Sequence, residues 1–182
     1  EIPLCPYDSC RLLAINLYSY VVHPFTKDAY FDFDLFKKHV GLAQRIMDDI
    51  IDLELEKIER IMEKIDSDPE SEEVKGAERN LWQKIYKKSG QGRRTGVGIT
   101  AEGDMLAAMG LRYGTEEATA FSEEVHKTVA LEAYRSSVNM AKERGAFAIY
   151  DWEREKDNPF VNRIKEADPT LYEEMKQYGR RN

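Results

Sequence analysis

Both cysteines of this 182-residue chain lie within its first ten residues, EIPLCPYDSC, as Cys5 and Cys10. A disulfide between them would need Cα atoms within about 7 Å, whereas five extended residues span roughly 16 Å. Pro6 begins a Pro-Tyr-Asp-Ser sequence with turn chemistry, so a local disulfide is allowed but not favoured. The spacing is not C-x-x-C, which argues against a thioredoxin motif and a zinc knuckle. Redox chemistry at either thiol therefore calls for a partner cysteine outside this chain.

Glu123 and His126 form E-x-x-H, which is half of the ligand pattern of a di-iron carboxylate bundle. Such a centre needs a second E-x-x-H, and none occurs around the three histidines of the sequence. An exposed or hydrogen-bonded histidine is the preferred interpretation. Because the cysteines also lack zinc-site spacing, we expect no stoichiometric metal.

The segment GVGITA places Gly96, Gly98 and Ala101 at the spacing G-x-G-x-x-A of a dinucleotide-binding turn. In that motif a strand precedes the first glycine, but Arg93 and Arg94 stand there instead. No strand with a terminal acid follows about 20 residues later. Tight packing of a strand against a helix is therefore the favoured interpretation. The sequence contains no P-loop, G-x-S-x-G or H-E-x-x-H.

The elements that position these residues are mainly helical. Apolar residues 12–22 predict a buried strand, and apolar residues at three- and four-residue steps from about Asp34 predict a long helix. Asp68 and Pro69 should cap and start a second helix that ends near Gly90.

The second half of the chain predicts further short elements. In chain order they are a strand within residues 92–101, a small helix over 102–109, a helix from the cap Thr115 to Gly145, a brief strand over 147–150, and a last helix from Asp168-Pro169 to Gly179. About three strands are too few for a complete sheet, because short buried strands need neighbours on both sides. The pattern predicts an α/β piece of a larger sheet or barrel.

Composition indicates one globular domain and excludes several functions. Hydrophobic residues make up 42% and charged residues 34% of the chain. The net charge is −7, with Lys and Arg scattered among acids, which argues against a nucleic-acid surface and a polybasic membrane contact. No apolar run reaches the roughly 18 residues of a membrane span. Few cysteines and no secretion signal predict a cytoplasmic protein. Without an initiator Met, we expect the chain to be processed or cut from something longer.

Several longer blocks occur in a fixed order, namely EIPLCPYDSCRLLAINLYSYV, GRRTGVGITAEGDMLAAMGLRYGT, EVHKTVALEAYRSS, MAKERGAF and GRRN. Together they resemble the catalytic-barrel domain of ribonucleotide reductase large chains, closest to the adenosylcobalamin-dependent (class II) type. The resemblance covers nearly the whole chain and is least diagnostic over residues 53–88. It implies a single partial domain over residues 1–182, a mainly helical fragment of the family's ten-stranded α/β barrel with few strands of its own. It also implies conversion of ribonucleotides to deoxyribonucleotides by thiyl-radical chemistry.

The resemblance assigns roles to two residues of this chain. A finger loop in the family carries Asn-x-Cys-x-Glu, and Glu1 aligns with its glutamate, so the thiyl cysteine would stand two positions earlier. Glu1 would then handle the 3′-hydroxyl proton of the ribose. Cys10 aligns with one member of the reducing cysteine pair, whose partner lies far upstream in the family, and disulfide formation there supplies two electrons. Cys5 receives no role, and the segment that binds substrate phosphate would follow Asn182.

The resemblance also implies partners and a cofactor. Adenosylcobalamin would serve the complete enzyme, with its site largely outside this chain. The partners would be the remaining segments of the reductase, a ribonucleotide substrate, and a thioredoxin-type reductant or dithiol. We expect the isolated chain to be inactive and to self-associate through bare strand edges. The alternative is a non-catalytic helical interaction module that binds a partner through those edges.

Overall fold

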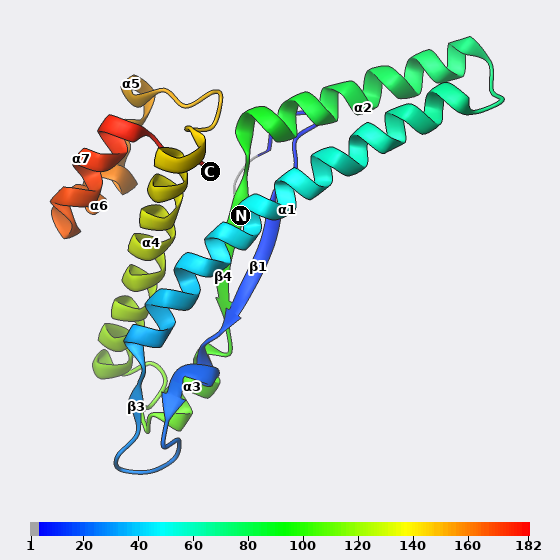
Figure 1. Ribbon diagram of the computed structural model, residues 1–182. Helices are drawn as coiled ribbons and strands as arrows, with labels where there is room; N and C mark the ends of the chain where they lie inside the picture. The colour runs from blue at the N-terminus through cyan, green and yellow to red at the C-terminus, as the bar shows by residue number, and fades with distance from the viewer. Residues whose placement is uncertain (1–3) are drawn as a thin grey trace.

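Two parallel strands form the centre of the computed structural model, which describes residues 4–182 (Figure 1). Strand β1 (Arg11–Asn16) pairs with β4 (Thr95–Thr100) in a register that runs from Arg11↔Thr95 to Asn16↔Thr100. Parallel neighbours need a long crossover connection. Here the crossover contains the helices α1 (Phe33–Ser67) and α2 (Glu72–Gly92).

The predicted strand over residues 12–22 is interrupted, because residues 17–20 are not extended and Val21–Val22 belong to a separate strand. The Asn16 side chain accepts a hydrogen bond of 3.1 Å from the backbone nitrogen of Tyr18, which turns the chain into the 3-10 helix η1 (Leu17–Tyr20). Leu17 and Tyr20 enter the core from this turn. Two further strands follow and pair antiparallel, β2 (Val21–Val22) and β3 (Tyr30–Phe31).

Helix α1 confirms the predicted long amphipathic helix. The side chain of Asp32 caps its start by accepting a 2.9 Å hydrogen bond from the backbone nitrogen of Leu35. The buried positions recur at three- and four-residue steps: Phe36, Val40, Ala43, Gln44, Met47, Asp48, Ile51, Ile58 and Ile65. The first half of the helix packs on the sheet and on α4 (Glu116–Arg144), and the second half forms an antiparallel arm with α2 (Figure 1).

Helix α2 begins and ends later than predicted. Asp68 cannot cap it, because its carboxylate binds Lys64 at 2.6 Å and the residue closes α1 instead. Ser71 caps α2 through a 3.4 Å hydrogen bond from the backbone nitrogen of Val74, and Pro69 lies in the turn between the helices. The helix also continues beyond Gly90.

Beyond β4 the main helices are where the sequence predicted them. They are α3 (Glu102–Ala108), α4, which Thr115 caps and Gly145 ends, and α7 (Pro169–Tyr178), which Asp168 caps and Gly179 ends. The short helices α5 (Trp152–Glu155) and α6 (Pro159–Ala167) were not predicted. The predicted strand over residues 147–150 is wrong: the backbone nitrogen of Tyr150 donates to the carbonyl oxygen of Phe147 at 2.9 Å and closes a turn there.

The main core lies between the sheet, η1 and the helices α1, α3 and α4. Its fully or nearly fully buried members include Leu17, Phe36, Val40, Met105, Ala118 and Val125. A second core joins α4 to α6 and α7 through Val138, Val161, Ile164, Leu171 and Met175. The main core covers only one face of the β1–β4 pair, which leaves its other face open.

Arg93 closes α2 in a left-handed conformation, with φ +44° and ψ +48°. A residue other than glycine pays about 1–3 kcal/mol for such a backbone. The buried guanidinium compensates, because it donates hydrogen bonds of 2.8 Å to Asp48 and to Asp52. The direction of the chain as it enters β4 therefore depends on an ion pair as well as on the backbone.

We predict that Arg93→Ala and Arg93→Gly both lower the free energy of unfolding, measured by urea denaturation. Arg93→Ala should cost about 3–5 kcal/mol, because it leaves buried carboxylate charge without its partner. Arg93→Gly loses the same pair but relieves the left-handed strain, so it should be about 1 kcal/mol more stable than Arg93→Ala. Wild-type stability in Arg93→Gly would contradict the proposed weight of the ion pair.

Candidate functional site

The open face of the β1–β4 pair carries small and uncharged side chains. Strand alternation places Arg11 and Ile15 on the helix side, where both are buried, whereas Leu12 on the other side is 65% exposed. The residues that share this open face are Leu12, Ala14 and Asn16 of β1 with Gly96, Gly98 and Thr100 of β4. Within residues 4–182, this face is where the sheet is accessible to another molecule or segment.

Cys10 stands directly before β1, in alternation with Leu12. A Cβ atom built on Gly96 would lie 3.7 Å from its sulfur and 2.6 Å from a methyl group of Leu12. This contact places the half-buried thiol at the edge of the open face. It also accounts for the first glycine of the motif, because a side chain at position 96 would have to displace the exposed end of Leu12. Gly96 and Gly98 lie inside β4, so tight packing is the correct interpretation, although the partner is β1 and not a helix.

Cys5 lies in the predicted turn. The backbone nitrogen of Asp8 donates a 3.1 Å hydrogen bond to the carbonyl oxygen of Cys5, and Tyr7 has φ +66°. Pro6 followed by a left-handed residue is the pattern of a type II turn. Cys5 is exposed, and the two cysteines form no disulfide with each other.

A fixed cation lies close to both thiols. Arg94 donates a 2.6 Å hydrogen bond to the carboxylate of Asp8, which is almost fully buried. This hydrogen bond is the main cause that raises the pKa of Arg94, and the negative charge of Asp8 and of the Cys5 and Cys10 thiolates raises it further against the opposing effect of burial. A guanidinium beside a sulfur stabilises the negative charge that develops there in thiol–disulfide exchange.

The segment that carries Cys10 is tied to both helices of the crossover. Arg11 pairs with Glu54 of α1 and donates a 2.9 Å hydrogen bond to the side-chain oxygen of Ser89 in α2. It also donates to the carbonyl oxygen of Ser9 at 3.2 Å. These contacts hold the start of β1, and with it the thiol, in one position.

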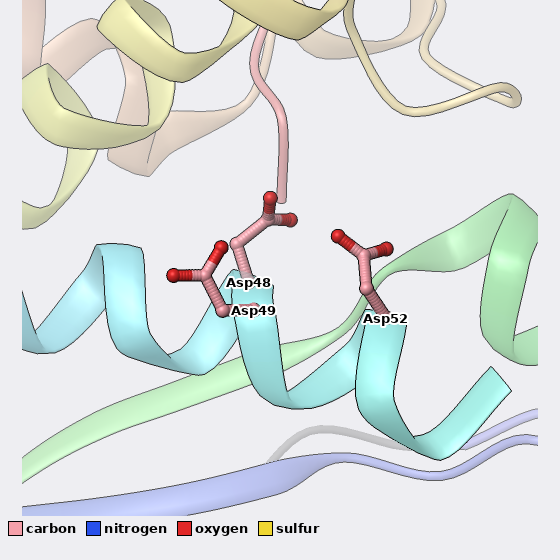
Figure 2. Close-up of side chains that lie close together, drawn as sticks. All are labelled: Asp48, Asp49 and Asp52. Carbon is pink, nitrogen blue, oxygen red and sulfur yellow. The ribbon is translucent and has the colours of Figure 1, made fainter. Parts of the chain in front are cut away.

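Three aspartates of α1, Asp48, Asp49 and Asp52, have carboxylate oxygens within 4.8 Å of one another (Figure 2). Such a cluster is able to hold a cation, but here arginines occupy its surroundings. Asp48 is fully buried, and its two carboxylate oxygens accept hydrogen bonds from four side chains: Arg93 at 2.8 Å, Asn182 at 2.8 Å, Arg144 at 3.1 Å and Arg181 at 3.3 Å. We therefore assign the cluster to structure and not to metal binding.

The surroundings of Asp48 have opposing effects on its acidity. Burial favours the neutral acid, but hydrogen bonds from Asn182 and Arg93, with the charges of Arg93 and Arg181, outweigh burial and lower the pKa of Asp48 below its usual value. The carboxylate is therefore ionised in the folded protein.

The E-x-x-H pair does not form part of a metal cluster among the described residues. His126 is 53% exposed, and its Nε2 lies 3.5 Å from a carboxylate oxygen of Glu102 on α3. This agrees with the predicted exposed histidine. The candidate Glu1 lies outside the described residues.

Sequence reasoning missed the network around Asp48. Two signals were available: the only charged residue among the buried positions of α1 is Asp48, and the tripeptide GRR occurs both before β4 and before Asn182. A buried aspartate predicts a buried positive partner, and the two GRR tripeptides supply the arginines that bind it.

Comparison with known proteins identifies the family. The model of the family described as "Ribonucleotide reductase, barrel domain" matches residues 1–182. The chain belongs to this family. Its fold is accordingly that of a mainly helical part of the reductase α/β barrel, as the resemblance implied. None of the helices in residues 4–182 combines the length and the hydropathy needed to cross a membrane.

Curated relatives carry reductase names. The chain is 30% identical over 158 residues to a vitamin B12-dependent ribonucleoside-diphosphate reductase of Thermoplasma acidophilum, a match that covers 85% of this chain and 17% of that protein. The protein of the same name from Mycobacterium tuberculosis (strain H37Rv) is 29% identical over 150 residues, covering 82% of this chain and 17% of the relative. A ribonucleoside-diphosphate reductase subunit alpha of Chlamydia pneumoniae is 28% identical over 148 residues, a match that covers 80% of this chain and 11% of that protein. The chain thus spans less than a fifth of the length of these relatives.

We predict that Asp48→Asn lowers the free energy of unfolding by about 3–5 kcal/mol at pH 7, because it leaves buried arginines without their carboxylate. The pKa of Asp48 is lower in the folded than in the unfolded protein, so its contribution is complete above about pH 4 and disappears as the pH falls through the folded-state value. The difference between wild type and variant should therefore shrink below about pH 4. Asp49→Asn is the matched control: Asp49 is half exposed, and its loss should cost less than about 1 kcal/mol. Equal losses in both variants at pH 7 would contradict the central role of Asp48.

Proposed function

We propose that this chain forms part of the catalytic barrel of a reductase that converts ribonucleotides to deoxyribonucleotides by thiyl-radical chemistry. The observation that carries the proposal is the position of Cys10, at the edge of the open sheet face and near the guanidinium of Arg94. Membership of the reductase barrel family and the names of the relatives support it.

Cys10 would supply half of the reducing equivalents. Replacement of the ribose 2′-hydroxyl by hydrogen consumes two electrons, and the hydroxyl leaves as water. The thiol of Cys10 and a second thiol from another segment of the reductase release two electrons and two protons when they form a disulfide. An external dithiol or thioredoxin-type reductant then restores both thiols. In the same scheme the carboxylate of Glu1 accepts the proton of the 3′-hydroxyl.

Two of the relatives are named vitamin B12-dependent, which supports adenosylcobalamin as the cofactor that would supply the radical in the complete enzyme. In the part of the chain that the structure describes, the open face offers one thiol, one leucine, and small, hydroxyl or amide side chains. These are too few to enclose a corrinoid. We therefore assign the cofactor-binding residues to other segments of the reductase.

The remaining segments of the reductase are thus the main partners that we propose, together with the ribonucleotide and the reductant. We propose a cytoplasmic location and no contact with nucleic acid or membrane, consistent with the net charge of −7. Alone, the chain should be inactive, and its two-stranded sheet should associate with further copies.

The first test is deoxyribonucleotide formation by the complete reductase with adenosylcobalamin, ribonucleotide and dithiol. Cys10→Ser should abolish multiple turnover, because serine cannot form the disulfide that delivers electrons. Cys5→Ser is the matched control: it removes a thiol five positions away and should keep turnover within about twofold of wild type, as expected for an exposed surface position. Full turnover in Cys10→Ser, or its loss in Cys5→Ser alone, would show that the wrong thiol has been assigned.

The second test concerns Glu1. Glu1→Gln should slow the chemical step by about 10²-fold or more, which is the usual contribution of a positioned base. Single-turnover kinetics measure this step apart from disulfide reduction. An unchanged single-turnover rate would reject the role of Glu1 and leave that of Cys10 intact.

A further inference from the structure

Arg94 is the neighbour of Cys10 across the β1–β4 pair. The register pairs Arg11 with Thr95, and the backbone nitrogen of Arg11 donates a 3.4 Å hydrogen bond to the carbonyl oxygen of Arg94. Cys10 and Arg94 directly precede the paired residues, so they stand side by side where the sheet begins. The side chains of Arg11 and Thr95 both point to α1, where each binds a side chain of that helix. Strand alternation therefore turns Cys10 and Arg94 toward the open face.

Asp8 fixes the guanidinium of Arg94. One carboxylate oxygen of Asp8 accepts a 2.9 Å hydrogen bond from the backbone nitrogen of Ser9, and the other accepts the 2.6 Å hydrogen bond from Nε of Arg94. Among the described residues, Asp8 is the only acceptor that this guanidinium binds. Its two terminal nitrogens are therefore available to a negative charge that develops beside them. The Arg94 side chain is only 28% exposed, so water screens this charge less than it would in bulk solution.

Other titratable groups surround Cys10 as well. They come from β1, α1, α2 and the turn that precedes β1: Arg11, Glu54, Lys84, Cys5 and Asp8. Arg11 and Glu54 form an ion pair on the helix side of β1, so their charges largely cancel. The carboxylate of Asp8 opposes a thiolate, but it is two residues away and is itself paired with Arg94. Arg94 is the direct neighbour, and a guanidinium beside a sulfur favours the thiolate, which makes that sulfur the better leaving group.

The sheet covers one side of the Cys10 sulfur. A Cβ atom built on Gly96 would lie 3.7 Å from Sγ, and a methyl group of Leu12 lies over the same glycine. A second sulfur from another segment of the reductase therefore reaches Cys10 from the side away from Gly96. In thiol–disulfide exchange the attacking thiolate approaches in line with the bond that breaks. Attack on Cys10 would have to come through Gly96 and Leu12, whereas attack on the second sulfur does not meet this sheet.

We propose that Arg94 makes Cys10 the leaving group when the disulfide of the reducing pair is reduced again, so that the external dithiol attacks the second cysteine. One thiolate of the dithiol bonds to the sulfur of the second cysteine. The bond between that sulfur and Sγ of Cys10 breaks, and its electron pair stays on Sγ beside Arg94.

The remaining step restores the second cysteine. The other thiolate of the dithiol displaces this cysteine and closes the disulfide of the reductant. The two protons of the dithiol return to the two cysteines, so the reductant loses two electrons and the reductase gains them. The inference rests on the proposed function, because it takes the disulfide of Cys10 from that proposal.

The test uses the complete reductase with Cys5→Ser as background, oxidised by diamide so that the disulfide of Cys10 forms without turnover. Mercaptoethanol is then added briefly, because its single thiol opens the disulfide and remains as a mixed disulfide, and excess N-ethylmaleimide stops the exchange. Peptide mass spectrometry shows which cysteine carries mercaptoethanol and which carries maleimide. We expect maleimide on Cys10 and mercaptoethanol on the second cysteine, at least about tenfold over the reverse. A ratio near one, or mercaptoethanol mainly on Cys10, would overturn the proposal.

Variants of Arg94 test the part played by its charge. Arg94→Met should lower the ratio about three- to tenfold, and Arg94→Lys, which keeps the charge, should retain most of it. Lys84→Met is the matched control: it removes a cation that lies 5.1 Å from the ring of Tyr7, in the same turn, and should keep the ratio within about twofold. An unchanged ratio in Arg94→Met, or an equal fall in Lys84→Met, would overturn the proposal. Should Arg94→Met fail to fold, the ratio in the background protein decides alone.

A second readout separates charge from position. In the reduced protein, the pH midpoint of Cys10 alkylation by iodoacetamide should rise in Arg94→Met and stay unchanged in Lys84→Met. A purely structural role of Arg94 would change the alkylation rate at every pH alike and leave the midpoint in place, and that result would overturn the proposal.

The disulfide is made chemically, which keeps the two proposals apart. A reductase whose Cys10 disulfide opens as expected but that forms no deoxyribonucleotide would reject the proposed function and keep the leaving group. An active reductase that carries mercaptoethanol on Cys10 would keep the function and reject the leaving group.

Discussion

The buried carboxylate of Asp48 joins three parts of the chain that are distant in sequence. It lies in the middle of α1 and binds Arg93 at the entrance to β4, Arg144 at the end of α4, and the terminal residues Arg181 and Asn182. An arginine buried or half-buried without the carboxylate would lower the stability of the fold, because its charge would have no partner. The carboxylate buried without the arginines would be neutral. Together they set the direction in which β4 starts and the position of the C-terminal end. Both are needed to form a groove between β4 and α4.

A second constraint acts at the other edge of β4. The end of the Leu12 side chain lies directly over Gly96, so a larger residue there would displace it, and Cys10 lies against the same glycine. The thiol is therefore positioned by the contact between two strands, and the pairs Arg11–Glu54 and Arg94–Asp8 keep its segment from moving. The helices cover one face of the sheet, and the thiol of Cys10 lies at the edge of the other.

The open face and the groove have different chemical characters. The face carries a thiol, glycines and hydroxyl or amide groups, which suits a reaction with a polar substrate. The groove, a cavity of about 730 Å³ between β4 and α4, is lined by apolar side chains of α4 and contains the buried, unsatisfied Nε of Arg180. Both surfaces border β4.

Much of the local structure followed from the sequence alone, because it depends on neighbouring residues. The amphipathic period of α1, the caps at Thr115 and Asp168, and the turn after Pro6 were all predicted, and the aligned blocks led to the family. The errors arose where a distant or competing contact decided the outcome. The ammonium group of Lys64 binds the carboxylate of Asp68, so Asp68 does not cap α2 and the helix starts later than predicted. The backbone nitrogen of Phe147 donates a hydrogen bond to the carbonyl oxygen of Arg180, where a strand was expected. The Asp48 network, the contact of Leu12 with Gly96 and the groove beside β4 join residues tens of positions apart. Only tertiary packing decides which of the many charged residues become buried partners.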